Sequence, residues 1–211
     1  MLMAITGQVM ILFILIHVLG NSTVFFGGLN GYAEKLHSLP LLVWTARFIM
    51  LIMLFVHVFF SITLTLQNRK AKSDAYAVKK FLRSTFASRS MIWTGLITGA
   101  FLIYHLLHFT IQVIDPAASA GINADAMGRP DVAGMVITGF QNFFIALIYV
   151  AAMVALLMHL IHGIQSSFQT LGMNNDRTLP VITKAGSFAA IILFLGYVSI
   201  PVIIFLGLMK G

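Results

Sequence analysis

The chain alternates between long apolar stretches and shorter segments that carry nearly all of its charged side chains. A bilayer core of about 30 Å requires roughly 20 helical residues to cross it, and five stretches reach that length. We expect membrane spans at residues 4–28, 41–66, 91–114, 139–169 and 185–209. All six acidic residues lie between these spans, because a charge placed in hydrocarbon is costly. The pattern predicts an all-α integral membrane protein with five transmembrane helices, forming one domain over residues 1–211.

The amino-acid composition excludes a water-soluble globular fold. Hydrophobic residues make up 59% of the chain and charged residues only 9%, whereas a soluble domain carries about 25% charged residues. Cysteine is absent, which excludes disulfides, thiolate-bound zinc, Cys-ligated iron–sulfur clusters and covalent haem attachment in this chain. The first span is too long for a cleavable signal peptide, and no basic segment precedes it.

The distribution of lysine and arginine predicts the topology. Nine of them lie in the segments 67–90 and 170–184, against three on the other side, namely Lys35, Arg129 and Lys210. Cytoplasmic loops carry the excess of basic residues, so we expect the N-terminus inside and the C-terminus outside. The net charge of +7 is then mostly a topology signal with added contact to acidic lipid or a protein partner, and we expect no nucleic-acid binding.

Histidine recurs within the spans, and its imidazole can bind a metal or transfer a proton. Six of the seven histidines lie in the first four spans: His17, His57, His105, His108, His159 and His162. A lone intramembrane histidine is ordinarily a neutral side chain hydrogen-bonded across helices, but six over four consecutive spans require another explanation. Proton relays usually add carboxylates, which these spans lack. A haem with two imidazole ligands requires histidines at one depth on facing helices, as helical bundles provide.

The depths of four histidines agree in pairs. At about 1.5 Å per residue, His17 and His105 lie about 15 and 14 Å from the outer ends of their spans. By the same rise, His57 and His159 lie about 14 and 15 Å from the inner ends of theirs. We therefore expect the first four helices to form a bundle that binds two stacked haems, an outer one on His17 and His105 and an inner one on His57 and His159.

The remaining polar residues of interest have weaker assignments. His108 and His162 each follow a proposed ligand by three residues, on nearly the same helix face, so either could be the ligand instead. We interpret them as groups that hydrogen-bond a haem propionate or a quinone. Polar groups at the outer end gather around Glu34, His37 and Arg47, where we expect quinone contact. Arg47 could equally extend to the interface, and Glu34 could be a solvated loop charge.

The order of these motifs resembles a known family over nearly the whole chain. The motifs are Leu15-Ile-His17-Val-Leu-Gly-Asn21, Phe55-Val-His57, Thr94-Gly95 with His105 ten residues later, and His159-Leu-Ile-His162-Gly163 running into Ser166-Ser-Phe-Gln-Thr-Leu-Gly172. Together they resemble the dihaem cytochrome b membrane anchor of succinate:quinone oxidoreductases. The similarity is to the single-chain, five-helix type of bacterial succinate dehydrogenases and fumarate reductases.

The resemblance implies a function, cofactors and partners. It implies two b haems, with axial ligands at His17, His57, His105 and His159 and the same pairing of spans that depth predicts. It further implies a flavoprotein with covalent FAD and an iron–sulfur protein on the cytoplasmic face of a bacterial inner membrane, with the basic 67–90 loop as a docking surface. Electrons would pass through the two haems to a membrane quinone, with menaquinone favoured. Arg89, one turn before the third span, would contact a propionate.

The sequence also departs from the family and leaves alternatives open. Leu157 and Met158 precede His159, and no span contains Asp or Glu, so we do not expect the proton route that an acidic residue provides there in some members. A cytochrome b anchor of a hydrogenase or nitrate reductase would satisfy the same histidines. A haem-free transporter is a further alternative, and its signature would be helices broken at mid-membrane. Succinate chemistry itself is not expected in this chain.

Overall fold

The computed structural model describes residues 1–71 and 86–209, and this part of the chain is helical between its loops. The α-helices are α1 (Leu2–Asn21), α2 (Leu29–His37), α3 (Pro40–Lys70), α4 (Phe86–Arg89), α5 (Met91–His105), α6 (Val132–Gln141), α7 (Phe143–Thr170) and α8 (Thr178–Phe205). Short 3₁₀ segments occur at Ser22–Phe26 and Pro116–Ala118, and a π-helical turn, Leu106–Thr110, continues α5. No strand occurs in these described residues.

Five of these helical segments are long and apolar enough to cross a membrane: Leu2–Phe26, Pro40–Lys70, Met91–Thr110, Phe143–Thr170 and Thr178–Phe205. The all-α fold with five candidate spans is therefore confirmed. The expected fourth span began too early, at residue 139. Asn142 has extended backbone (ψ 120°), and its side chain accepts a hydrogen bond from the Phe144 N–H at 3.0 Å. This N-cap starts α7 at Phe143, so residues 139–141 belong to the separate helix α6.

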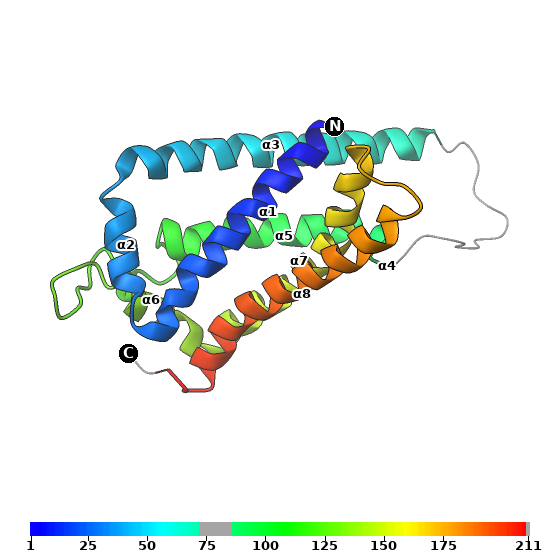
Figure 1. Cartoon of the computed structure of the whole chain (residues 1–211). Helices are drawn as coiled ribbons and strands as arrows, with labels where there is room; N and C mark the ends of the chain where they lie inside the picture. Colours follow the sequence, from blue (N-terminus) through cyan, green and yellow to red (C-terminus); the bar gives the residue numbers. More distant parts are fainter. Residues whose placement is uncertain (72–85, 210–211) are drawn as a thin grey trace.

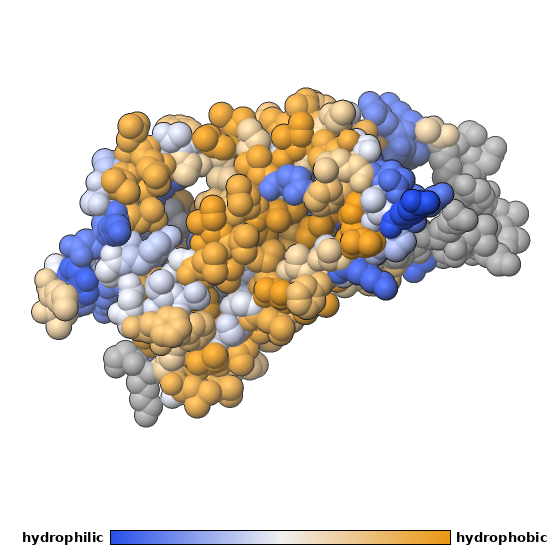
Figure 2. All heavy atoms as spheres, viewed as in Figure 1, coloured by the Kyte–Doolittle hydropathy of each residue, from blue (hydrophilic) through white to orange (hydrophobic). Residues whose placement is uncertain are grey.

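The long helices run side by side between two different ends (Figure 1). At the end that we call the basic end, α3 and α7 stop and α5 and α8 begin, with Arg69, Lys70, Arg177 and Lys184 nearby. At the other end, called the capped end, α2 and α6 lie beside the places where α1, α5 and α8 stop. Apolar side chains cover most of the face between the ends (Figure 2), as a lipid-facing surface requires.

Packing within the bundle is uneven. α7 packs most extensively against α8, and it also contacts α5 and α1. α3 packs chiefly against α1, and none of its described residues is fully buried. α1, α3, α7 and α8 each continue without interruption across the bundle, so they lack the paired half-helices that mark a transporter. α3 is thus the helix with the least protein around it, although its middle carries His57.

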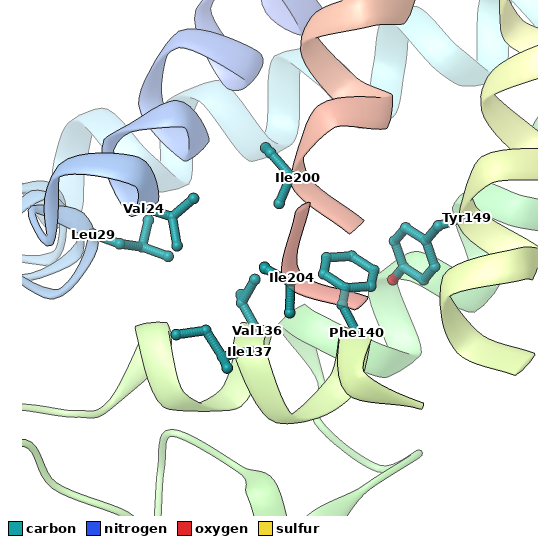
Figure 3. Close-up of a cluster of buried hydrophobic side chains, with 8 residues drawn as sticks. All are labelled: Val24, Leu29, Val136, Ile137, Phe140, Tyr149, Ile200 and Ile204. Carbon is teal, nitrogen blue, oxygen red and sulfur yellow. The ribbon is translucent and has the colours of Figure 1, made fainter. Parts of the chain in front are cut away.

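The capped end is closed by apolar and polar contacts. Buried side chains from five elements form its apolar cluster (Figure 3): Val24, Leu29, Val136, Ile137, Phe140, Tyr149, Ile200 and Ile204. Beside it, the Asn30 amide donates to Asp131 at 2.9 Å and Asp125 at 3.2 Å, and its carbonyl accepts from the Ala133 N–H at 2.7 Å. These contacts join α2 to α6 and to the loop before it, so the α2–α6 cap is held to the bundle as a unit.

Candidate functional site

The imidazole rings of His57 and His159 face each other across the bundle, nearer its basic end. His57 lies on α3 and His159 on α7, and their ring centroids are 6.4 Å apart at an interplanar angle of 63°. A threonine hydroxyl from a neighbouring helix lies against each ring. Oγ1 of Thr6 on α1 is 3.2 Å from Nδ1 of His57, and Oγ1 of Thr94 on α5 is 3.4 Å from Nδ1 of His159. Four helices therefore build this basic-end pair.

The two threonine hydroxyls favour one protonation state of each ring. The Thr6 hydroxyl lies 3.0 Å from the Leu2 and Met3 carbonyls, and the Thr94 hydroxyl lies 3.1 Å from the Met91 carbonyl. A hydroxyl has one proton to donate, so a threonine that donates to its own helix accepts from the imidazole Nδ1–H. Nε2 of each ring is then unprotonated, which is the form that binds a metal.

Glycines let the helices approach these rings closely. A Cβ added at Gly7 would lie 3.5 Å from Cε1 of His57, and one added at Gly95 would lie only 3.2 Å from Cε1 of His159. A 3.2 Å approach is tighter than ordinary carbon–carbon contact of about 3.5–4.0 Å. Each Thr-Gly step thus provides a hydroxyl for Nδ1 and a flat surface for the ring edge.

The second pair of imidazoles lies nearer the capped end. His17 on α1 and His105 on α5 have ring centroids 5.9 Å apart and planes at 89°. The hydroxyl of Tyr149 on α7 is 3.3 Å from Nδ1 of His105. On the other side, the Tyr197 ring of α8 lies 6.2 Å from the His17 ring, and its hydroxyl donates to the Ile14 carbonyl at 2.6 Å. The two pairs thus occupy two levels of one bundle.

The two levels are linked by a repeated spacing in the sequence. Thr6-Gly7 precedes His17 by the same interval as Thr94-Gly95 precedes His105. Eleven residues from threonine to histidine make about three helical turns and about 16 Å, so both side chains lie on similar faces. Thr94-Gly95 is among the sequence motifs above, whereas Thr6 and the role of both hydroxyls were not predicted from the sequence. The repeated Thr-Gly-x₉-His spacing is the signal that could have found them.

The ring separations of 6.4 and 5.9 Å would suit two imidazoles that hold one haem iron. A metal–imidazole bond of about 2 Å places two rings on opposite sides of one metal with centroids about 6 Å apart. All four histidines are only partly buried although each lies within a helix. Residues 1–71 and 86–209 contain no cluster of three or more His, Asp or Glu side chains suited to a metal. Paired imidazoles suit a haem, whose porphyrin supplies the other ligands.

His108 and His162 occupy different surroundings from these pairs. His108 is only 3% exposed and stacks on Phe109 with ring centroids 4.0 Å apart. A Cβ added at Gly139 on α6 would lie 3.3 Å from both Cε1 and Nε2 of His108. Its Nε2 edge therefore faces the α6 backbone rather than His17. His162 is partly buried on α7, one turn nearer the basic end than His159.

The structure does not bring Glu34, His37 and Arg47 into one site. The Glu34 carboxylate lies 3.6 Å from the Arg129 guanidinium. Nδ1 of His37 lies 2.8 Å from the Ala33 carbonyl, within its own helix. The Arg47 guanidinium lies 5.0 Å from the centre of the Trp44 ring. Each of the three has a different partner, so their contact with a quinone stays a prediction.

The basic segment expected to dock partner subunits is only partly described. Its residues 72–85 lie outside the described part of the chain. Arg89 is the last residue of α4 and is exposed beside the start of α5. This places Arg89 at the basic end, and its contact with a haem propionate stays a prediction.

Comparison with known protein families gives one match. A family model described as succinate dehydrogenase/fumarate reductase transmembrane subunit matches residues 65–194, more than half of the chain. The matched region contains His105 and His159 but begins after His17 and His57. No match was found among curated proteins or solved structures. The match favours this family over the hydrogenase and nitrate reductase anchors that the histidines alone left open.

Proposed function

This chain belongs to the succinate dehydrogenase/fumarate reductase transmembrane subunit family, and we propose that it is a dihaem cytochrome b anchor that passes electrons from an iron–sulfur subunit to a membrane quinone. The proposal rests on one observation: two pairs of imidazole rings lie at two levels of one bundle, with ring centroids 6.4 and 5.9 Å apart. The chain alone performs no succinate chemistry, which belongs to a flavoprotein partner with FAD.

In this proposal His57 and His159 hold the inner haem, and His17 and His105 hold the outer haem. Each bound haem supplies an iron that accepts and releases one electron at a potential set by its ligands and surroundings. The protein's contribution is to orient the imidazoles. The Thr6 and Thr94 hydroxyls contact Nδ1 of His57 and His159. The unprotonated Nε2 of each ring therefore points away from the helix that carries the threonine.

The two histidine pairs lie at different depths of the bundle. Thr6 marks the level of the inner pair on α1, and His17 lies at the level of the outer pair on the same helix. The rise per residue places the two levels about 16 Å apart. One site is therefore nearer the basic end and the other nearer the capped end, and their separation is about half of the ~30 Å bilayer core.

The two ends of the bundle receive different partners in this proposal. The basic end, with Arg69, Lys70, Arg177 and Lys184, lies in the cytoplasm by the positive-inside rule and contacts the iron–sulfur subunit. The N-terminus is then inside and the C-terminus outside a bacterial inner membrane. The capped end, near the outer haem, is the region of quinone contact, with menaquinone favoured by analogy to the bacterial five-helix type.

Absorption spectroscopy with redox titration of the purified complex tests the proposal. Two reducible b-type haems per chain are expected. His57→Ala and His159→Ala should each remove the inner haem, and His17→Ala and His105→Ala should each remove the outer one. His37→Ala is the matched control, because His37 lies in α2 outside the spans and should leave both haems in place. A wild-type complex without reducible b-type haem contradicts the proposal.

A further inference from the structure

One tyrosine hydroxyl lies between two histidines at the capped end. The Tyr149 oxygen is 3.3 Å from Nδ1 of His105 and 3.1 Å from Nδ1 of His108. Tyr149 is only 6% exposed, and its ring packs edge-on against Phe101, with centroids 4.9 Å apart. It packs edge-on against Phe140 as well, with centroids 4.8 Å apart (Figure 3). These aromatic contacts hold the ring, so the hydroxyl has a defined position between the two imidazoles.

The backbone of the third span presents both histidines to this hydroxyl. α5 ends at His105 and continues as the π-helical turn Leu106–Thr110, in which the Ile111 N–H donates to the Leu106 carbonyl at 2.7 Å. Such wide turns are uncommon and occur frequently at functional sites. Here His105 lies just before the turn and His108 within it, and both Nδ1 atoms reach the same phenolic oxygen.

Counting protons gives the direction of both hydrogen bonds. This step rests on the proposed function, in which Nε2 of His105 binds iron. Nδ1 of His105 then carries a proton and donates it to the Tyr149 oxygen. The single Tyr149 proton remains available for Nδ1 of His108, whose own proton is left on Nε2. The order is therefore His105 to Tyr149 to His108.

We propose that Tyr149 is a positioning residue for the outer haem, and that His108 positions Tyr149 in turn. By accepting from Nδ1 of His105, the Tyr149 oxygen fixes the ring in its Nδ1-protonated form and makes Nε2 a more basic ligand. A more basic ligand stabilises the oxidised iron and lowers its midpoint potential. By accepting the Tyr149 proton, His108 keeps the phenolic oxygen turned as an acceptor towards His105.

His108 is suited to this role and not to ligation. Its ring is almost fully buried, and its Nε2 edge lies against the backbone of Gly139 on α6. A haem-sized plane has no access to that edge. This role also differs from the propionate or quinone contact expected from the sequence.

The inner pair is arranged differently and provides an internal reference. Its threonines donate their hydroxyl protons to carbonyls of their own helices, so their acceptor role depends on main-chain atoms. Tyr149 depends instead on the side chain of His108. Substitutions at Tyr149 and His108 should therefore change the outer haem and leave the inner haem unchanged.

Redox titration of the purified complex carrying Tyr149→Phe tests the proposal. Phenylalanine keeps the ring packing and removes only the hydroxyl. Both haems should be retained, with a higher midpoint potential and an altered electron paramagnetic resonance signal for the outer haem alone. Tyr197→Phe is the matched control, because the Tyr197 hydroxyl bonds to the Ile14 carbonyl, and it should shift neither haem. Two haems with unchanged potentials in Tyr149→Phe overturn the proposal.

Variants of His108 provide the second arm. His108→Leu removes the acceptor of the Tyr149 proton and should raise the midpoint potential of the outer haem. His108→Asn places an acceptor oxygen near the former Nδ1 position and should return that potential towards the wild-type value. The double variant His108→Leu with Tyr149→Phe should have the same outer-haem midpoint potential as Tyr149→Phe alone, because both changes act through one hydroxyl. Additive shifts, or loss of a haem in His108→Asn, overturn the proposal. A wild-type complex without two haems instead overturns the proposed function itself.

Discussion

Thr6 and Thr94 occupy equivalent positions in the two halves of the bundle. Thr6 on α1 contacts Nδ1 of His57 on α3 at 3.2 Å, and Thr94 on α5 contacts Nδ1 of His159 on α7 at 3.4 Å. Each is followed by a glycine that faces the same ring. The His57–His159 pair is therefore built from two similar helix pairs that present their imidazoles to each other.

The first prediction concerns these hydroxyls. Thr6→Val and Thr94→Val keep the shape of the side chain but remove the hydroxyl beside Nδ1, so the imidazole loses this restraint on its orientation. Loss of such a partner typically weakens metal binding about 10- to 100-fold. Haem content measured by absorption during purification should fall at the inner site only.

Serine provides the matched control for the threonine variants. Thr6→Ser and Thr94→Ser retain the hydroxyl and should keep the inner haem. If valine and serine variants lose haem equally, packing of the methyl group rather than the hydrogen bond is responsible. Loss of the outer haem in either valine variant would also contradict the assignment of the threonines to the inner site.

The second prediction concerns the space beside His159. Gly95→Ala places a methyl group 3.2 Å from Cε1 of His159, which requires the ring or α5 to move and should displace the inner haem. Gly99→Ala is the matched control on the same helix, since an added Cβ there meets no protein atom within 4 Å. Alanine is favoured over glycine in a helix by up to about 1 kcal/mol, so Gly99→Ala should bind haem normally. Equal haem loss in both variants would mean that α5 tolerates no alanine, and not that the ring needs space.

The third prediction concerns Asn30, which holds α2 to α6. Asn30→Ala leaves the Ala133 N–H and two carboxylates without this partner. Each unmade hydrogen bond of a buried group costs about 1–3 kcal/mol, so the thermal unfolding temperature of the detergent-solubilised complex should fall while haem content stays normal. Asn30→Asp should be more harmful at neutral pH, because it adds a third carboxylate beside Asp125 and Asp131. An unchanged unfolding temperature in both variants would contradict the role of Asn30.

The fourth prediction concerns the pH dependence of the capped end. Hydrogen bonds from Arg129 lower the pKa of Asp125 from its ordinary value of 3.8 to about 2. A carboxyl whose pKa is depressed in the folded state contributes stability above its unfolded pKa, and this contribution is lost as pH falls from about 4 towards 2. Asp125→Asn should remove that part of the pH dependence of the unfolding temperature. An identical acid profile in wild type and Asp125→Asn would show that the pair with Arg129 contributes nothing.

The approximate spans and the depths of the histidines along them follow from local sequence patterns. Charged side chains are expelled from hydrocarbon, so the five apolar segments and their polar boundaries follow from composition along the chain. Depth within a span is a position along one axis at a constant rise per residue, and His17, His57, His105 and His159 were therefore placed at two levels without knowing how the helices pack.

Which side chains meet around each level depends on how the helices pack together. The rotation of each helix and the identity of its neighbours depend on packing between segments distant in the chain, which no local pattern records. Thr6 and Tyr149 were missed for this reason, and Glu34, His37 and Arg47 were grouped although each has its own partner. Likewise, α6 was merged in part with the fourth span, because residues 139–141 are apolar and only the extended backbone of Asn142 separates the two helices.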